Sequence, residues 1–349
     1  MTSRERVFDA INNKKTDRVP TNYTAHTSMT EKLISHLGVK DEDELLDALN
    51  VDMRRVPCVV NQPNTGPDCD GYYSNMWGLK SKDPLIINFA KDNVYPFNED
   101  SSLDDVYSHN WPDASLLDLS YVYDECGKYL DKYAIFGSPW CEFFHTIGWM
   151  IGQEDYFILM TERPELIDAI TTHVVDYYVD ATDRFLKAAG GRIDITYFGN
   201  DFGTQRSLFI SPTHWNRFIR PSYKRLVDVS KSYNCKVMLH TCGAVRELIP
   251  IFIEMGVDII DPIQVTATGM DFDSVYNDFS AEICLHGAVD MQRTLPLGSV
   301  QDVRDEVKSR IKTVGKNAGY ILAPSQELLE TVPFDNVLAM YETAYEQKM

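Results

Sequence analysis

The sequence lacks several features that would place it in a specialised class of protein. No apolar stretch approaches the ~18 residues of a membrane-spanning helix, and no segment is of low complexity. Positive charge is scarce, because 33 lysines and arginines stand against 52 aspartates and glutamates, a formal net charge of -19. Nucleic acids and anionic membrane surfaces repel such a protein. We therefore expect it to bind neither of them.

The seven cysteines show no paired spacing, and their number is odd. A disulfide framework is therefore not predicted. Residues 1–6 do not have the pattern of a secretory signal, so we expect a cytoplasmic protein with free thiols. The thiols expected in the core are Cys58, Cys126, Cys235 and Cys284.

Short β-rich runs alternate with helix-period segments along all 349 residues. Eight strands are predicted, at Val19–Tyr23, Met53–Cys58, Ala134–Ser138, Ile193–Gly199, Lys236–His240, Asp258–Ile263, Ile283–Gly287 and Gly319–Ala323. The predicted helices include Pro164–Ala189, which has proline in its first turn, and Val300–Val314, which Ser299 would cap. Eight strands that are each followed by a helix predict an α/β fold of the (β/α)8 TIM barrel type.

No linker divides the sequence, so we predict a single domain over residues 1–349. Ser3–Asn13 is predicted as an additional N-terminal helix. Residues 61–98 are rich in proline, glycine, asparagine and aspartate, and Asp70-Gly71 is a hairpin signal. We interpret this segment as an insertion after the second strand, near the mouth of the barrel.

Polar side chains follow most of the predicted strands. They are Thr24, His26, Trp140, Cys141, Glu142, Asn200, Asp201, Gln205, Arg206, His240, Cys242, Gln264, His286, Asp290, Ser325, Gln326 and Glu327. The active site of a TIM barrel lies at the C-terminal ends of its strands, so this convergence predicts a functional site on one rim. His145, His173 and His214 fall in helical segments and are interpreted as structural.

His240 and Cys242 stand where a buried strand runs into a glycine turn. Residues i and i+2 of a strand project from the same side, so the imidazole and the thiol should point together. Both are good zinc ligands. A metal at this pair is our prediction, and a packed thiol is the alternative.

Four segments carry a resemblance that extends over nearly the whole sequence. They are Asn200-Asp201-Phe202-Gly203-Thr204-Gln205-Arg206, His240-Thr241-Cys242-Gly243, Gly319-Tyr320-Ile321-Leu322-Ala323-Pro324-Ser325 and Pro333-Phe334-Asp335-Asn336-Val337. They resemble the uroporphyrinogen decarboxylase superfamily and, within it, the branch of cobalamin-dependent methyltransferases. The resemblance implies a (β/α)8 barrel, in agreement with the strand count.

The two branches of this superfamily imply different chemistry. The decarboxylases need an arginine-rich segment after the first strand, where Thr21–Ser28 has no arginine, although Asp52 could match their catalytic aspartate. The methyltransferases hold zinc between a His-x-Cys pair and a later cysteine, where this sequence has Ser325. A carboxylate from Glu142, Asp201 or Glu327 could complete the zinc site instead.

The resemblance implies a methyltransferase that moves a methyl group from a small methoxy or methylamine compound to the cobalt of a corrinoid protein, with zinc as Lewis acid. Glu142 would be a further zinc ligand, and Glu142 or Asp201 would be a proton donor. Predicted substrate-binding residues are Tyr23, His26, Trp140, Gln205, Gln264, His286, Ser325 and Gln326. A decarboxylase of a smaller acid and a non-catalytic barrel that binds a corrinoid or tetrapyrrole are the alternatives. A homodimer is one open alternative for the oligomeric state.

Overall fold

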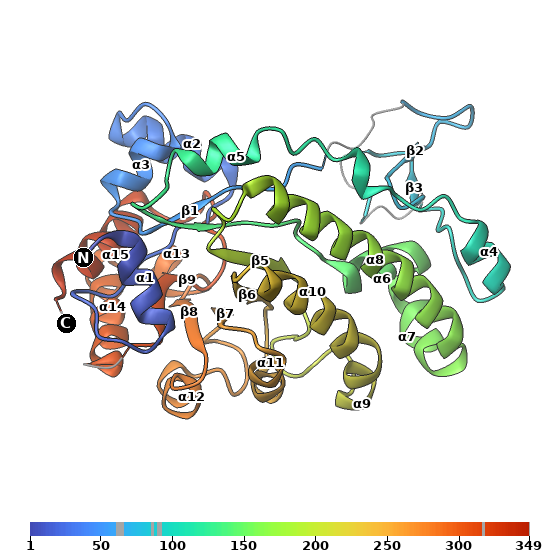
Figure 1. The fold of residues 1–349 in the computed structure, drawn as a ribbon. Helices are drawn as coiled ribbons and strands as arrows, with labels where there is room; N and C mark the ends of the chain where they lie inside the picture. The colour runs from blue at the N-terminus through green and yellow to red at the C-terminus, as the bar shows by residue number, and fades with distance from the viewer. Residues whose placement is uncertain (61–65, 85–86, 89–92, 316–317, 349) are drawn as a thin grey trace.

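The structure is a computed structural model, and it describes residues 1–60, 66–84, 87–88, 93–315 and 318–348. Helices surround a seven-stranded parallel sheet (Figure 1). The strands of this sheet are β1 (Met53–Arg55), β4 (Ala134–Phe136), β5 (Ile195–Gly199), β6 (Lys236–His240), β7 (Ile259–Ile263), β8 (Cys284–Val289) and β9 (Tyr320–Pro324). The α-helices are α1 (Ser3–Ile11), α2 (Thr27–Leu37), α3 (Glu42–Ala48), α4 (Leu103–Ser108), α5 (Val122–Gly127), α6 (Phe143–Ile151), α7 (Gln153–Glu162), α8 (Pro164–Ala189), α9 (Pro212–His214), α10 (Arg220–Ser232), α11 (Ile249–Met255), α12 (Phe272–Phe279), α13 (Thr294–Leu297), α14 (Val300–Val314) and α15 (Phe334–Glu346).

The order of the strands in the sheet, β1-β4-β5-β6-β7-β8-β9, follows the chain, and each neighbouring pair is parallel. This is the α/β barrel architecture that the sequence predicts. The predicted first strand, Val19–Tyr23, is not a regular strand, because its proline lacks an N–H for a ladder. Its backbone still joins both edges of the sheet. The Asn22 N–H donates to the Leu322 carbonyl of β9, and the Asp52 N–H, just before β1, donates to the Thr21 carbonyl.

The interior of the barrel changes from apolar to polar along the strands. Its apolar layer includes Val7 and Ile11 of α1 with Met53, Ile195, Met238 and Ile259 of the strands. Residues two positions further along a strand face the same side, and these are Arg55, Tyr197, His240 and Asp261. Helix α1 therefore packs against the N-terminal end, and the polar interior positions gather at the C-terminal end, where the sequence predicts a site.

The N-terminal end holds a buried ion network around Asp52. This carboxylate is fully buried, and it accepts from Arg6 Nη1 at 2.6 Å and from Arg18 Nη1 at 2.7 Å. The backbone N–H of Thr21 donates to it at 2.8 Å. Such partners compensate for the cost of burying a charge. Asp52 therefore stabilises the end of the barrel that lies opposite His240.

Parts of the predicted insertion, residues 61–65, 85–86 and 89–92, lie outside the described residues. In the described part, β2 (Tyr73–Ser74) and β3 (Lys80–Ser81) pair antiparallel, and in Figure 1 they lie with α4 far from both chain ends. The Asn75 N–H donates to the Leu79 carbonyl, which closes the turn between β2 and β3. Asp70-Gly71 forms a separate tight turn just before β2, in which the Asp68 N–H donates to the Tyr72 carbonyl.

The two helices predicted from their period have the expected bounds. Helix α8 has proline in its first turn and ends at Gly190, which adopts the left-handed conformation. Helix α14 begins with a capping box in which Ser299 accepts from the Asp302 N–H. None of the helices in the described part of the chain combines the length and the apolar content of a membrane span.

Candidate active site

His240 and Cys242 lie side by side at the C-terminal end of β6. The Cys242 Sγ is 3.5 Å from the His240 Nε2, and the Asp201 Oδ1 is 3.5 Å from the same nitrogen. Within the described residues these three atoms form the one group of possible metal ligands that lie within 4.8 Å of one another. Glu142 and Glu327, the other carboxylates considered, do not belong to it. Nitrogen, sulfur and oxygen donors in this combination suit zinc.

Asp261 fixes the orientation of His240, and sequence analysis did not identify it. It is the neighbour of His240 in the β6–β7 register. Its carboxylate accepts from the His240 Nδ1 at 2.7 Å, the Tyr197 hydroxyl at 2.6 Å and the His286 Nδ1 at 2.5 Å. A histidine that donates its Nδ1–H to a carboxylate presents the lone pair of its other nitrogen to a metal. Asp261 is thus a support for the candidate ligand His240.

His286, predicted to bind substrate, is instead part of that support. Only 1% of it is exposed, because its ring lies between Asp261 and the amide of Asn22. The Asn22 Nδ2 lies 3.0 Å from the His286 Nε2. An amide nitrogen can only donate, so His286 Nε2 accepts and Nδ1 carries the proton that bonds Asp261. Both polar atoms of His286 are therefore engaged inside the barrel wall.

Contacts within the site determine whether Asp201 and His240 are ionised. Burial disfavours a carboxylate, but hydrogen bonding and attraction from His240 lower the pKa of Asp201 to about 2. Burial also disfavours an imidazolium, but Tyr197, Asp201 and Asp261 outweigh it and raise the pKa of His240 well above its ordinary value. In the absence of metal, His240 therefore keeps a proton on Nε2, the nitrogen that faces Asp201 and Cys242. A metal at Nε2 must displace it, as is usual for histidine ligands.

The loop that carries Cys242 is held by close backbone contacts. Gly243 has a φ of +91°, and a Cβ there would lie 2.3 Å from the Gly203 backbone. Glycine is therefore required where the two loops touch. The Cys242 N–H donates to Asp201 Oδ1 at 2.9 Å, and the Gly243 N–H donates to Gln264 Oε1 at 2.8 Å. Asp201 and Cys242 are thus fixed relative to each other.

Ser325 stands where the resemblance would place a third cysteine, and its hydroxyl is engaged by a backbone N–H. Its buried Oγ accepts from the Met291 N–H at 3.1 Å. The next residue, Gln326, makes the contact instead, with its Nε2 2.9 Å from the Cys242 Sγ. Its Oε1 accepts from the Glu327 N–H, which leaves the amide nitrogen to donate. Gln326 therefore supports the sulfur of Cys242 without being a metal ligand.

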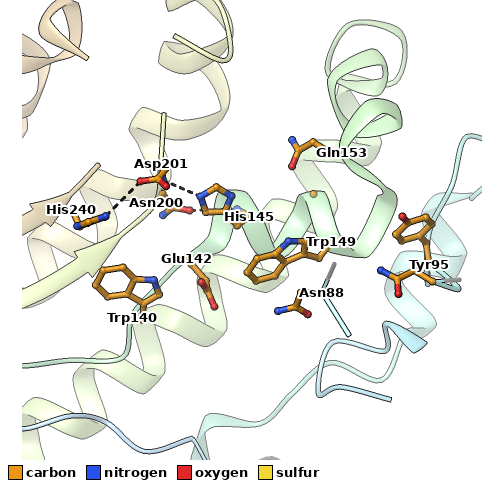
Figure 2. A pocket seen from close by; sticks show the side chains of 12 residues that line it. Asn88, Tyr95, Trp140, Glu142, His145, Trp149, Gln153, Asn200, Asp201 and His240 are labelled. Carbon is orange, nitrogen blue, oxygen red and sulfur yellow. Dashed lines mark hydrogen bonds and ion pairs between the residues drawn. The ribbon is translucent and has the colours of Figure 1, made fainter. Parts of the chain in front are cut away.

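Glu142 points into a cavity of about 680 Å3 beside His240 (Figure 2). The cavity is lined by Asn88, Asn93, Tyr95, Trp140, Glu142, His145, Gly148, Trp149, Gln153, Asn200, Asp201 and His240. Burial alone raises the pKa of Glu142 to about 7, since no other described residue bonds its carboxyl group. The preceding residue, Cys141, has a φ of +56°. Left-handed backbone at a non-glycine residue is strained and is often found at functional sites.

His145 belongs to the site, contrary to the interpretation of it as structural. Its Nε2 accepts from the Asp201 N–H at 2.9 Å, and its ring stacks on Trp149 with centroids 5.9 Å apart. Burial lowers the pKa of His145. The Asn200 Oδ1 accepts from the Phe144 N–H at 3.0 Å in the first turn of α6. This side chain therefore holds the helix that presents Glu142 and His145.

The other predicted substrate residues are scattered over the rim. Tyr23 lines a neighbouring cavity of about 350 Å3, and burial raises its pKa to about 12. His26 is exposed and caps α2 through Ser28, so it does not line the cavities at the mouth. Gln205 and Gln264 line a third cavity with Cys242, Ser325 and Gln326.

Arg55, which sequence analysis overlooked, also reaches the mouth. It comes from the end of β1 and lines a cavity of about 400 Å3 together with Tyr197 and His240. Its guanidinium lies 5.9 Å from the centre of the Tyr197 ring. Trp140 and His240 line both this cavity and the one at Glu142. They therefore form the wall between the two.

Trp140 is held in place by the absence of a side chain at Gly199. A Cβ at this position would lie 1.9 Å from the Trp140 ring, and Trp140 packs edge-on against Tyr197 at 4.9 Å. We predict that Gly199→Ala lowers the free energy of unfolding by about 1–3 kcal/mol through overpacking and shifts tryptophan fluorescence. Denaturant titration measures the first effect. Gly127→Ala is the control, since its Cβ meets only the end of the Arg192 side chain, and an equal loss in both variants would contradict the prediction.

Comparisons with known proteins bear on the fold and the family. The sequence matches the family described as Uroporphyrinogen decarboxylase (URO-D) over residues 88–347. A solved structure described as a methyltransferase from Methanosarcina mazei resembles this one with a TM-score of 0.66, over 99% of each chain and at 17% sequence identity. At this identity the likeness shows a shared fold. The search of curated proteins gave no match.

Proposed function

Since the chain belongs to the uroporphyrinogen decarboxylase family, we propose that the site at its barrel mouth transfers a methyl group. The proposed donor is a small compound of the methoxy or methylamine type, and the proposed acceptor is the cobalt(I) of a separate corrinoid protein. One observation carries this proposal: His240, Cys242 and Asp201 converge beside a cavity with an acidic side chain. The likeness to a structure described as a methyltransferase supports it.

The residues present fit a zinc ion. His240 presents its Nε2 because Asp261 engages Nδ1, Cys242 supplies sulfur, and Asp201 supplies an ionised carboxylate. We propose these three as the ligands, without Glu142. Zinc held there would act as a Lewis acid toward the leaving oxygen of a methoxy donor, which has a lone pair to offer. The same Asp201 carboxylate accepts from the Cys242 N–H. This hydrogen bond fixes the positions of Asp201 and Cys242, two of the three proposed ligands, relative to each other.

The remaining residues of the cavity would bind and orient the donor. Methyl transfer is an in-line displacement, so the reacting carbon must face the open mouth while the leaving heteroatom faces His240 and Asp201. Trp140 and Trp149 offer apolar walls on either side of Glu142 (Figure 2). With a methoxy donor, Glu142 would give a proton to the leaving oxygen. With a methylammonium donor, the same carboxyl group would be the counter-ion.

The decarboxylase alternative loses its support in this chain. Asp52, the possible counterpart of the catalytic aspartate, is buried between Arg6 and Arg18 at the far end of the barrel. It cannot touch a substrate at the mouth. Within the described residues, Arg55 is the arginine that lines a cavity together with His240. One guanidinium cannot neutralise the eight carboxylates of uroporphyrinogen, so we expect no turnover of that compound.

The test is a methyl-transfer assay with protein purified without chelators. We expect bound zinc by metal analysis, and methylation of a reduced corrinoid protein, seen in its visible absorbance, when a methoxy or methylamine donor is added. Uroporphyrinogen should be left unchanged in a parallel assay. Corrinoid binding without methylation would favour the non-catalytic alternative, and efficient decarboxylation would overturn the assignment.

A further inference from the structure

We propose that the cavity at Glu142 binds a methylated ammonium cation, and that this cation is the methyl donor. The inference rests on the proposed methyl transfer and narrows its substrate to one of the two classes. It is carried by the charge and shape of the cavity, which has acceptors and aromatic rings on its walls.

The described lining of the cavity carries acidic side chains and neither lysine nor arginine. Glu142 has no hydrogen bond or ion pair from the described part of the chain, and burial is the sole cause that raises its pKa. The buried Asn93 Oδ1 also lacks a donor. A buried acceptor without a donor is costly. The Asn93 oxygen therefore calls for a hydrogen-bond donor on the ligand, and the Glu142 carboxylate calls for a positive charge.

The two histidines of the cavity do not supply that charge. The Nε2 of His145 accepts from the Asp201 N–H at 2.9 Å, so this nitrogen carries no proton. His240 is paired with Asp261 and Asp201. If zinc were held there, the Cys242 thiolate and the Asp201 carboxylate would balance its two charges. Among the described lining residues of this cavity, Glu142 would then be the carboxyl group without a compensating charge, and the net charge of -19 draws cations to the protein.

Aromatic rings line the same cavity as the Glu142 carboxyl group. Glu142 lies between Trp140 and Trp149, and Tyr95 stands farther along the same cavity (Figure 2). The faces of such rings attract alkylammonium groups, tryptophan most strongly. A methoxy donor would gain the apolar contact but not the pairing with Glu142. An ammonium donor would make both the apolar contact and the ion pair with Glu142. The cavity of about 680 Å3 is of ordinary size for a small ligand.

An ammonium donor also gives a balanced reaction. The carbon–nitrogen bond breaks and nitrogen keeps the electron pair. The cobalt(I) of the corrinoid protein supplies both electrons of the new cobalt–carbon bond and becomes methylcobalt(III). The amine that leaves is neutral, so no proton has to be supplied. It no longer pairs with the Glu142 carboxylate, and this loss of attraction favours release of the product.

The test compares choline with 3,3-dimethylbutan-1-ol, which has the same shape without the charge. Isothermal titration calorimetry on the purified protein needs no corrinoid partner. We expect choline to bind at least about tenfold more tightly. Glu142→Gln should remove most of that preference, and Glu142→Asp should retain part of it. Glu154→Gln, an exposed change on α7 outside the cavity, should leave it unchanged.

The outcomes separate this inference from the proposed function. Equal binding of the two probes, or a preference that survives Glu142→Gln, would overturn the cation site. If cobalt is then still methylated from a methoxy donor, the methyltransferase proposal stands without the cation site. Selective binding of choline with no methylation from any methylammonium compound would reject the cation as the donor. Selective binding together with methylation from such a compound would establish the proposal.

Discussion

Cys242→Ala is expected to lower the rate of methyl transfer at least about a hundredfold, which corresponds to about 3 kcal/mol of transition-state stabilisation. The reason is that Cys242 supplies one of the three atoms that converge on a metal position. Two protein ligands hold zinc much more loosely than three, so the variant should also lose zinc on dialysis. Initial rates of corrinoid methylation and the zinc content per chain measure the two effects.

The control for this change is Cys69→Ala, which removes an exposed thiol outside the site. Its rate and zinc content should equal those of the unchanged protein. All seven cysteines are free, so neither substitution breaks a disulfide. Full activity and full zinc content in Cys242→Ala would mean that this side chain is a packed thiol.

The fold could be predicted from the sequence because periodicity reports burial. Strand β6 and helix α8 have the predicted bounds, since each joins a continuous apolar pattern to a clear end signal, His240-Thr241 or Gly190. The prediction of a regular strand at residues 19–23 is wrong. Its apolar pattern is that of a strand, because it fills the place of one between β9 and β1, but its proline prevents a regular ladder.

The site could be predicted only in part, because pairing across strands is invisible in a linear pattern. His240 and Cys242 are close in sequence and were identified together. Asp261 was overlooked, although an acidic residue in a buried strand must find partners. The helical position of His145 predicts a structural role, because it says nothing about the loop that the ring faces, where Nε2 accepts from the Asp201 N–H.

Asp261→Asn is expected to lower the affinity for zinc about 10- to 100-fold and the free energy of unfolding by about 3–5 kcal/mol. The side chain keeps its size but loses its charge. Burial would raise the pKa of Asp261, but hydrogen bonds from His240 and His286 hold it below its ordinary value. An amide can accept from one of these rings at its oxygen, but its NH2 group faces the other.

Two measurements separate the metal effect from the stability effect. Competition with a chromophoric chelator gives the zinc affinity of the folded protein, and denaturant titration without metal gives the free energy of unfolding. Asp278→Asn is the matched control, since it breaks an exposed ion pair with Arg246 and should cost no more than about 1 kcal/mol. Its zinc affinity should not change. Unchanged zinc affinity in Asp261→Asn would show that His240 keeps its orientation without the carboxylate, and the role assigned to Asp261 would be wrong.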